Sequence, residues 1–261
     1  MQWGVYNQNI EESYILSLDM KELIKELATY SDKKRAKHSA GFFKTGKGEY
    51  GEGDIFIGVR VPEQRIVAKK YFKKISIWET FKLLNSKIHE QRLTALIILD
   101  YKFPKLSDQD QKEVVDLYLK NTKYINNWDL VDSSAHLILG AYMIKHKEDR
   151  KILYKLAKSK NIWERRIAML TTFAFIKKND YKDALKIAEI LLKDSHDLIH
   201  KAVGWMLREI GNRNLKVEED FLMKYCEKMP RVMLRYAIEK FNDEKKKIYY
   251  VVVQPKNLFL N

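Results

Sequence analysis

Along most of the chain, hydrophobic residues recur at helical spacing, and short polar segments separate these stretches. Five stretches share a pattern in which a small residue lies at the centre of an apolar helix face. Intervals of 40, 33, 34 and 35 residues separate these small residues. Several intervals also contain a second amphipathic stretch, at 111–119, 149–157 and 183–192. The five small residues are Ala95, Ala135, Ala168, Ala202 and Ala237.

Helix pairs that recur at this spacing are typical of HEAT and armadillo repeats, in which each pair covers its apolar stripe by stacking on the next. The pattern therefore predicts an all-α protein, a right-handed HEAT/armadillo-like α-solenoid whose concave groove suits an elongated ligand. An irregular helical bundle is the alternative. We expect one helical-repeat domain over residues 1–245, with a non-repeat N-terminal cap to about residue 75, repeats over about 76–245, and a tail over 246–261.

The N-terminal third lacks the repeat. Residues 19–37 are predicted to form one helix with Asp19 as its N-cap. Five of the ten glycines then fall within residues 41–54, which we interpret either as a flexible surface loop or as a segment that contacts a phosphate backbone. This segment does not match a P-loop. Pro62 suits the first turn of the next helix. At the other end of the chain, residues 248–254 are β-prone, and we assign no function to them.

Charge narrows the possible partners. The 49 Lys and Arg against 35 Asp and Glu give a formal net charge of +14, which indicates a polyanion, an anionic membrane surface, or a merely solvated basic surface. No apolar run has the length of a membrane span, and the N-terminus lacks the pattern of a signal peptide. A single cysteine, Cys226, excludes internal disulfides, and no histidine has metal-ligand spacing. We therefore expect a cytoplasmic protein without a metal or cofactor.

Three segments of the sequence contain distinctive motifs. Residues 126–132 read Asn-Asn-Trp-Asp-Leu-Val-Asp, residues 161–168 contain Trp-Glu-Arg-Arg, and residues 200–209 read His-Lys-Ala-Val-Gly-Trp-Met-Leu-Arg-Glu. Together these motifs resemble those of the AlkD branch of bacterial DNA alkylation repair proteins. The glycine-rich segment and Gly58-Val-Arg-Val-Pro62 are typical of a large subgroup of that family. The resemblance extends over about residues 19–245, with one departure: Asn127 stands where some members have a second tryptophan.

The resemblance implies a function. Family members bind duplex DNA in the concave groove and excise N3- and N7-alkylated purines, so the resemblance leads us to expect a DNA glycosylase of base excision repair. No lysine is marked as a Schiff-base nucleophile, so we expect a monofunctional enzyme, acting as a monomer, with no membrane partner. Whether the lesion is flipped out or stays stacked is left open. By motif, the catalytic residues would be Trp128, Asp132, Arg166 and Trp205, and the DNA-binding residues Arg208, Lys44, Lys47 and Phe43.

The chemistry also follows from the residue types. Departure of a cationic purine builds an oxocarbenium-like sugar, which an ionised carboxylate such as Asp132 would stabilise. Trp128 precedes Asp132 by four residues, so both side chains share one helix face. Asp129 is interpreted as a helix cap or a first-turn charge. The alternative interpretation is that the tryptophans belong to the core and that Arg166 is either solvated or pairs between repeats. A non-catalytic nucleic-acid-binding paralogue and a protein-interaction scaffold are the alternative functions.

Overall fold

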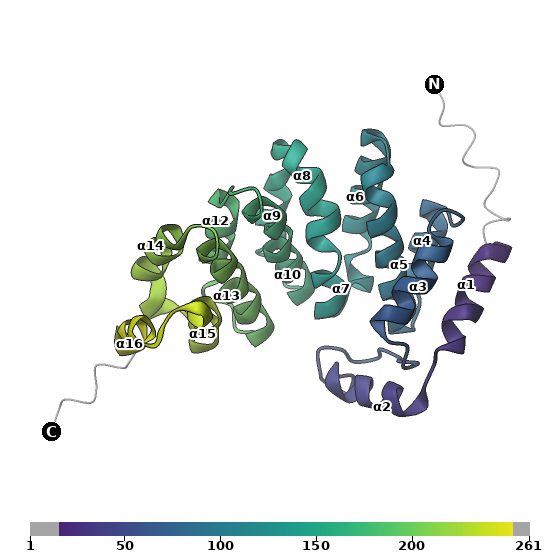
Figure 1. Cartoon of the computed structure of the whole chain (residues 1–261), viewed down its shortest axis with the longest axis horizontal. Coiled ribbons are helices and arrows are strands. Elements are labelled where there is room, and N and C mark those ends of the chain that lie inside the picture. The colour runs from purple at the N-terminus through teal and green to yellow at the C-terminus, as the bar shows by residue number, and fades with distance from the viewer. Residues whose placement is uncertain (1–15, 253–261) are drawn as a thin grey trace. The chain divides into compact units, whose positions relative to one another are not determined.

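The computed structural model describes residues 16–252, and the regular elements in this range are all helices (Figure 1). Within these residues no strand forms, and an isolated bridge joins Ile55 to Ile88. The chain divides into two compact units, Met1–Leu130 and Val131–Asn261. No helix in the described range is long and apolar enough to span a membrane.

The first unit is built around α5, against which α3 and α4 both pack, and α1 packs on α3. Its core contains fully buried residues of each of these helices, including Leu23, Val67, Leu84 and Leu96. Pro62 lies in the first turn of α3, as predicted. The helices of this unit are α1 (Leu18–Thr29), α2 (Lys33–Phe42), α3 (Val61–Tyr71), α4 (Ile77–Leu84), α5 (His89–Lys102) and α6 (Asp108–Lys120); α7 (Trp128–Asp132) follows.

In the second unit, α13 is the central helix and packs against α10, α12, α14 and α15. A π-helical turn, His136–Gly140, leads directly into α8. The remaining helices are α8 (Ala141–Lys145), α9 (Lys151–Leu156), α10 (Ile162–Thr171), α11 (Phe173–Ile176), α12 (Lys182–Leu191), α13 (Asp197–Gly211), α14 (Leu215–Tyr225), α15 (Arg231–Ala237) and α16 (Asp243–Val252).

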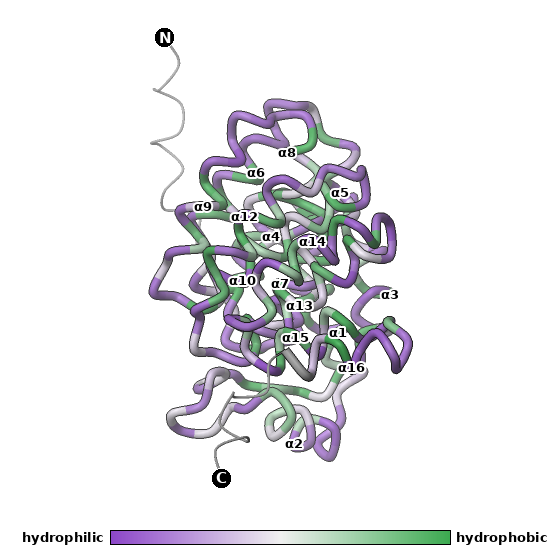
Figure 2. The backbone as a smooth tube through the Cα atoms, turned by 90° about the vertical axis from the view of Figure 1, so that its left-hand side faces the viewer, coloured by the Kyte–Doolittle hydropathy of each residue, from purple (hydrophilic) through white to green (hydrophobic). Residues whose placement is uncertain are grey.

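The repeat pattern corresponds to real packing. All five small residues are fully buried, as the close packing of neighbouring helices requires; they are Ala95, Ala135, Ala168, Ala202 and Ala237. The second helices expected in the intervals correspond to α6, α9 and α12. Hydrophobic and hydrophilic residues alternate along these helices, as amphipathic helices require (Figure 2). The prediction of an all-α, helical-repeat fold is confirmed.

The helix predicted over residues 19–37 was wrong in its length and in its cap. Two helices occupy this range, and the Ser17 side chain, rather than Asp19, caps α1 by accepting a hydrogen bond from the Met20 N–H at 3.2 Å. Asp32 interrupts the helix because its carboxylate accepts the Arg35 N–H at 2.8 Å and so caps α2. Asp19 lies in the first turn of α1 and pairs with Lys74 at 3.3 Å.

The β-prone segment at the C-terminal end begins as a helix. Asn242 caps α16 by accepting the Lys245 N–H at 2.9 Å, and acidic Asp243 and Glu244 occupy the first turn. Tyr249 is buried and packs on Phe241 with ring centroids 5.7 Å apart. These capping and packing contacts outweigh the β propensity of the segment, whose last residues lie outside the described range.

Candidate active site

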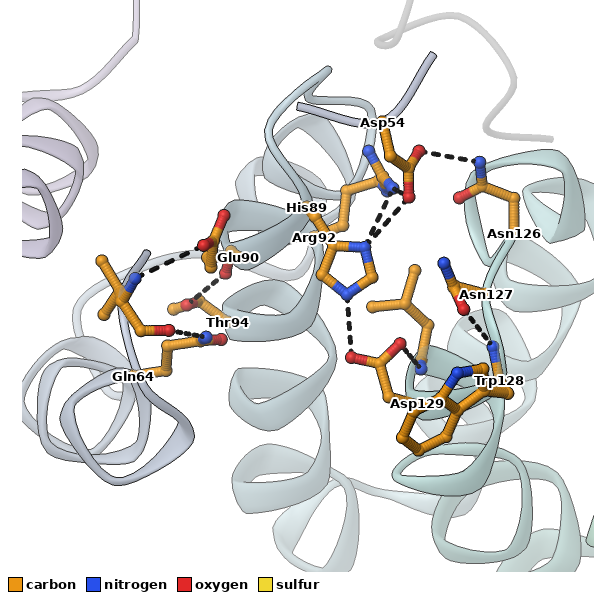
Figure 3. Close-up of polar contacts among 12 residues, drawn as sticks. Asp54, Gln64, His89, Glu90, Arg92, Thr94, Asn126, Asn127, Trp128 and Asp129 are labelled. Carbon is orange, nitrogen blue, oxygen red and sulfur yellow. Dashed lines mark hydrogen bonds and ion pairs between the residues drawn. The ribbon is translucent and has the colours of Figure 1, made fainter. Parts of the chain in front are cut away.

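A buried histidine lies between two carboxylates in the first unit. His89 begins α5, and its Nδ1 lies 3.0 Å from Asp54 Oδ2 while its Nε2 lies 2.8 Å from Asp129 Oδ2 (Figure 3). A neutral imidazole has one N–H, so two carboxylate partners favour the doubly protonated cation. Burial lowers the pKa of His89, but the hydrogen bonds to Asp129 and Asp54 outweigh it and raise the pKa above its usual range.

Asp54 joins this histidine to a second cation. Arg92 Nη2 lies 2.7 Å from Asp54 Oδ2, and Asn126 Nδ2 donates to Asp54 Oδ1 at 3.1 Å. Burial raises the pKa of Asp54, yet the hydrogen bond from His89 and the charge of Arg92 together hold it below its usual range. Two carboxylates and two cations therefore form one network whose charges cancel, which is what a buried site requires.

Glu90 holds the segment that follows the glycine-rich loop. Its carboxylate is buried and accepts backbone N–H groups from Gly58 at 2.7 Å, Ile57 at 3.1 Å and Val59 at 3.3 Å. Gly58 has φ +81°, and a Cβ there would collide with the Asp32 carbonyl oxygen, so glycine is required. This contact fixes the start of α2 against the segment.

An aromatic stack covers the buried network. Phe43 stacks on Phe56 with centroids 5.1 Å apart and on Trp128 with centroids 5.2 Å apart. His89 in turn stacks on Phe56 at 4.4 Å, and Phe42 meets the edges of Phe43 and Trp128. The stack places the first residue of α7 on the aromatic end of the glycine-rich loop.

In the second unit, Asp132 and Arg166 form a two-pronged ion pair. Arg166 Nε donates to Asp132 Oδ1 at 2.8 Å, and its Nη2 donates to Oδ2 at 2.7 Å. Arg166 Nη1 also donates to the Leu198 carbonyl oxygen at 2.5 Å, which anchors the guanidinium to α13. The arginine is buried, whereas 19% of the Asp132 side chain is exposed. The carboxylate is therefore fixed in orientation and still open to a ligand.

Aromatic rings also gather in the second unit. Phe173 lies 5.9 Å from Trp205 and 5.3 Å from His136, measured between ring centroids. Burial and the nearby Lys177 charge lower the pKa of His136 to about 4, so this histidine is neutral near pH 7. Lys177 itself lies over the Phe173 ring at 4.2 Å. Within residues 16–252, His, Cys, Asp and Glu side chains form no group of three that could hold a metal ion.

Comparison with known proteins identifies the family. The family model described as "DNA alkylation repair enzyme" matches residues 23–241, which is most of the chain. The chain belongs to this family. The resemblance of the sequence to DNA alkylation repair proteins is thereby confirmed. No curated protein matches the sequence.

Two solved structures are similar to this DNA alkylation repair family member. A predicted DNA alkylation repair enzyme from Enterococcus faecalis is 16% identical, with a TM-score of 0.66, over 82% of this chain and 97% of the other. AlkD2 from Streptococcus mutans is 17% identical, with a TM-score of 0.49, over 93% of this chain and 96% of the other. At 16% identity, the similarity to the Enterococcus faecalis structure establishes the fold and not the activity.

The structure distributes the residues predicted from the family motifs over both units. It brings Asp132 and Arg166 into direct contact, and it stacks Trp128 on Phe43. Trp205 contacts Phe173 in the second unit. Among the predicted DNA-binding residues, Arg208 forms an ion pair with Glu239, Lys47 is exposed, and Lys44, with φ 56°, lies 4.0 Å from Glu49.

The sequence interpretation missed the network of His89, Asp54 and Arg92, and it misjudged Asp129. That carboxylate is more than a first-turn charge, because it binds His89 from forty residues away. Asn127, where some family members have tryptophan, is fully buried and its Oδ1 accepts the Trp128 N–H at 2.8 Å. No local spacing in the sequence indicates the contacts of His89 with Asp54 and Asp129, since these partners lie 35 and 40 residues away.

Proposed function

We propose that this protein is a monofunctional DNA glycosylase that removes cationic N3- and N7-alkylated purines from duplex DNA in base excision repair. The observation that carries the proposal is the Asp132 carboxylate, held by Arg166 and 19% exposed in its side chain. Membership of the DNA alkylation repair enzyme family supports the choice of substrate.

In the proposed reaction, the bond between C1′ and the purine nitrogen breaks, and its electron pair stays on the base, which leaves neutral. The sugar then carries an oxocarbenium-like positive charge. A fixed carboxylate opposes this charge without having to reorganise during the reaction. Water adds to C1′ and loses a proton to solvent, so the products are a free alkylpurine and an abasic site.

Arg166 acts as a positioning residue in this proposal. Its two hydrogen bonds fix both oxygens of Asp132, and its bond to the Leu198 carbonyl fixes the guanidinium in turn. A bidentate arginine adds geometric specificity as well as energy to such a contact. Arg166 therefore keeps the Asp132 carboxylate in one orientation.

The aromatic residues have a separate role in the proposal. An indole ring attracts a cation by roughly 0.5–2 kcal/mol, so Trp128 and Trp205 would contribute to stabilising the cationic base and sugar. By family resemblance, Phe43, Lys44, Lys47 and Arg208 would contact the DNA. Lys47 is exposed, as such a contact requires.

Asp132→Asn tests the proposal because it removes the charge while keeping the shape. We expect single-turnover excision from duplex DNA with one N7-methylguanine to slow by about 10²–10³, with little change in DNA affinity. The matched control is Asp194→Asn, since Asp194 is also bound by an α10 arginine, Arg165, at 2.5 and 3.4 Å.

The control separates chemistry from stability. Equal slowing in both variants would show that Asp132 acts through packing, and wild-type excision by Asp132→Asn would disprove its catalytic role. If the wild-type protein bound duplex DNA and released no base from alkylated DNA, the protein would be a non-catalytic DNA-binding member of the family.

A further inference from the structure

Helix α2 has a composition that the packing of the first unit does not explain. None of its residues is buried, whereas a helix of a folded protein usually buries an apolar stripe. Figure 1 shows it set apart from α1, α3, α4 and α5 of the same unit. Its sequence, Lys-Lys-Arg-Ala-Lys-His-Ser-Ala-Gly-Phe, contains no acidic residue. A partner outside the fold is the natural explanation for such a helix.

One face of α2 is a cationic stripe, defined here as Lys34, Lys37, His38, Gly41 and Phe42. These residues follow the i, i+3, i+4, i+7, i+8 spacing that normally places apolar side chains toward a core. Together they line a surface depression of about 540 Å³. The stripe ends at Phe42, which is 57% exposed.

The polar side chains of the stripe are not used by the fold. Within the described residues, no side-chain hydrogen bond or ion pair engages Lys34, Lys37 or His38. By contrast, Arg35 on another face of α2 donates to the Gly58 carbonyl at 2.7 Å and to the Tyr30 carbonyl at 2.9 Å.

The nearest acidic side chains of the glycine-rich loop are already engaged. Glu49 accepts the Gly46 N–H at 2.8 Å, and Glu52 accepts the Gly48 N–H at 2.8 Å. These carboxylates stabilise turns of the loop and do not pair with the stripe. Its positive charge is therefore available to an external anion.

Gly41 adds an independent observation. It lies inside α2 without a positive φ, and a Cβ at this position would meet no atom within 4 Å. Glycine lowers the stability of a helix relative to alanine, so the fold gains nothing from it. A missing side chain does allow a ligand to approach the helix backbone closely.

We propose that the stripe binds the phosphodiester backbone of one strand of duplex DNA, with Lys34, Lys37 and His38 facing phosphates and Phe42 contacting the adjoining sugar. The inference rests on the proposed function, which supplies DNA as the substrate. Phe42 also meets the Trp128 ring edge-on at 5.9 Å. The stripe therefore connects the backbone contact directly to a predicted functional residue.

The apolar content of α2 favours nucleic acid over a lipid surface. A helix that lies in a membrane interface presents a broad apolar face of large side chains. The stripe presents Phe42 alone, because Phe43 is held in the stack with Phe56 and Trp128. Regularly spaced cations with one aromatic side chain fit a phosphate backbone and its sugars.

The test measures binding to an unmodified duplex by fluorescence anisotropy over a series of salt concentrations. Each lost phosphate contact lowers the slope of log K against log salt by about 0.9, so Lys34→Ala with Lys37→Ala should lower it by about 1.8. The control is Lys151→Ala with Lys155→Ala, which removes equal charge from two exposed lysines one turn apart on α9. The control should leave the slope unchanged.

Gly41→Ala is a second, charge-neutral variant. Because the position is open, we expect an unchanged or slightly raised Tm and an unchanged salt slope, but several-fold weaker binding. Unchanged affinity would remove the argument for close approach of the backbone.

Several outcomes would overturn the inference: equal slope changes in the α2 and α9 variants, an unchanged slope in the α2 variant, no DNA binding by the wild-type protein, or α2-dependent binding to phosphatidylserine vesicles with none to DNA. The anisotropy assay measures DNA binding and not base release, so its result does not depend on whether the proposed excision chemistry is correct. Conversely, a failed slope test leaves the Asp132 experiment intact.

Discussion

The two units hold their buried charges in different ways. In the first unit, His89 and Arg92 share the carboxylate of Asp54, of which 4% is exposed, and His89 also binds Asp129. In the second unit, Arg166 binds both oxygens of Asp132, and 19% of that side chain is exposed. In the first arrangement the buried charges compensate one another. In the second arrangement a fixed carboxylate remains partly exposed to solvent.

This difference separates a structural role from a chemical one. The shared carboxylate of the network, Asp54, is closed to substrate, whereas 16% of the Asp129 side chain is exposed. Burial of Asp54 costs desolvation energy, so its contribution is to hold the glycine-rich loop, α5 and α7 together. An oriented, partly exposed carboxylate can act on a developing positive charge. We therefore expect variants of the network to change stability and variants of Asp132 to change the reaction rate.

The largest expected effect is on stability. Asp54→Asn leaves His89 and Arg92 buried without their shared anion, and breaking a buried pair in this way costs about 3–5 kcal/mol. Urea denaturation followed by circular dichroism measures the free energy of unfolding. Asp132→Asn is the matched variant in the second unit and should lose less, because its side chain is partly exposed. An equal stability loss in both variants would remove the distinction between the two sites.

The two units should also respond to pH in opposite directions, the first through His89 and the second through His136. The folded pKa of His89 is raised above the reference value of 6.5, so its stabilising contribution is complete below that value and is lost as pH rises through the folded pKa. The folded pKa of His136 is about 4, so stability falls as pH drops from 6.5 toward 4, when the unfolded state binds a proton that the folded state does not.

Urea denaturation from about pH 4 to about pH 9 would measure both contributions as slopes of stability against pH. His89→Gln should flatten the slope above pH 6.5, and His136→Gln should flatten the slope between pH 6.5 and pH 4. The readout is the slope and not the overall loss of stability that either substitution causes. An unchanged alkaline slope in His89→Gln would mean that this histidine is neutral in the folded protein.

The sequence predicted those features that depend on local spacing. The five buried alanines were found because helical packing repeats along the chain, and the break between α1 and α2 was missed because Asp32 was not recognised as a cap. Asp132 and Arg166 were each predicted from family motifs, but their direct contact spans 34 residues. The His89 network was not predictable, because Asp54 and Asp129 lie 35 and 40 residues away on separate elements.

The smallest expected effect distinguishes the two tryptophans. Loss of one cation–π contact should slow release of a cationic alkylpurine by roughly 2- to 30-fold, which corresponds to about 0.5–2 kcal/mol. Trp128 also stacks on Phe43 at 5.2 Å with an interplanar angle of 20°, whereas Trp205 meets Phe173 at a tilt of 49°. Trp128→Ala should therefore lower both the excision rate and the Tm, while Trp205→Ala should lower the rate with little change in Tm.

Single-turnover excision and thermal unfolding by circular dichroism, measured on the same preparations, provide the comparison. A rate loss in Trp205→Ala that followed its loss of helicity would place this ring in the core and remove it from the proposed site.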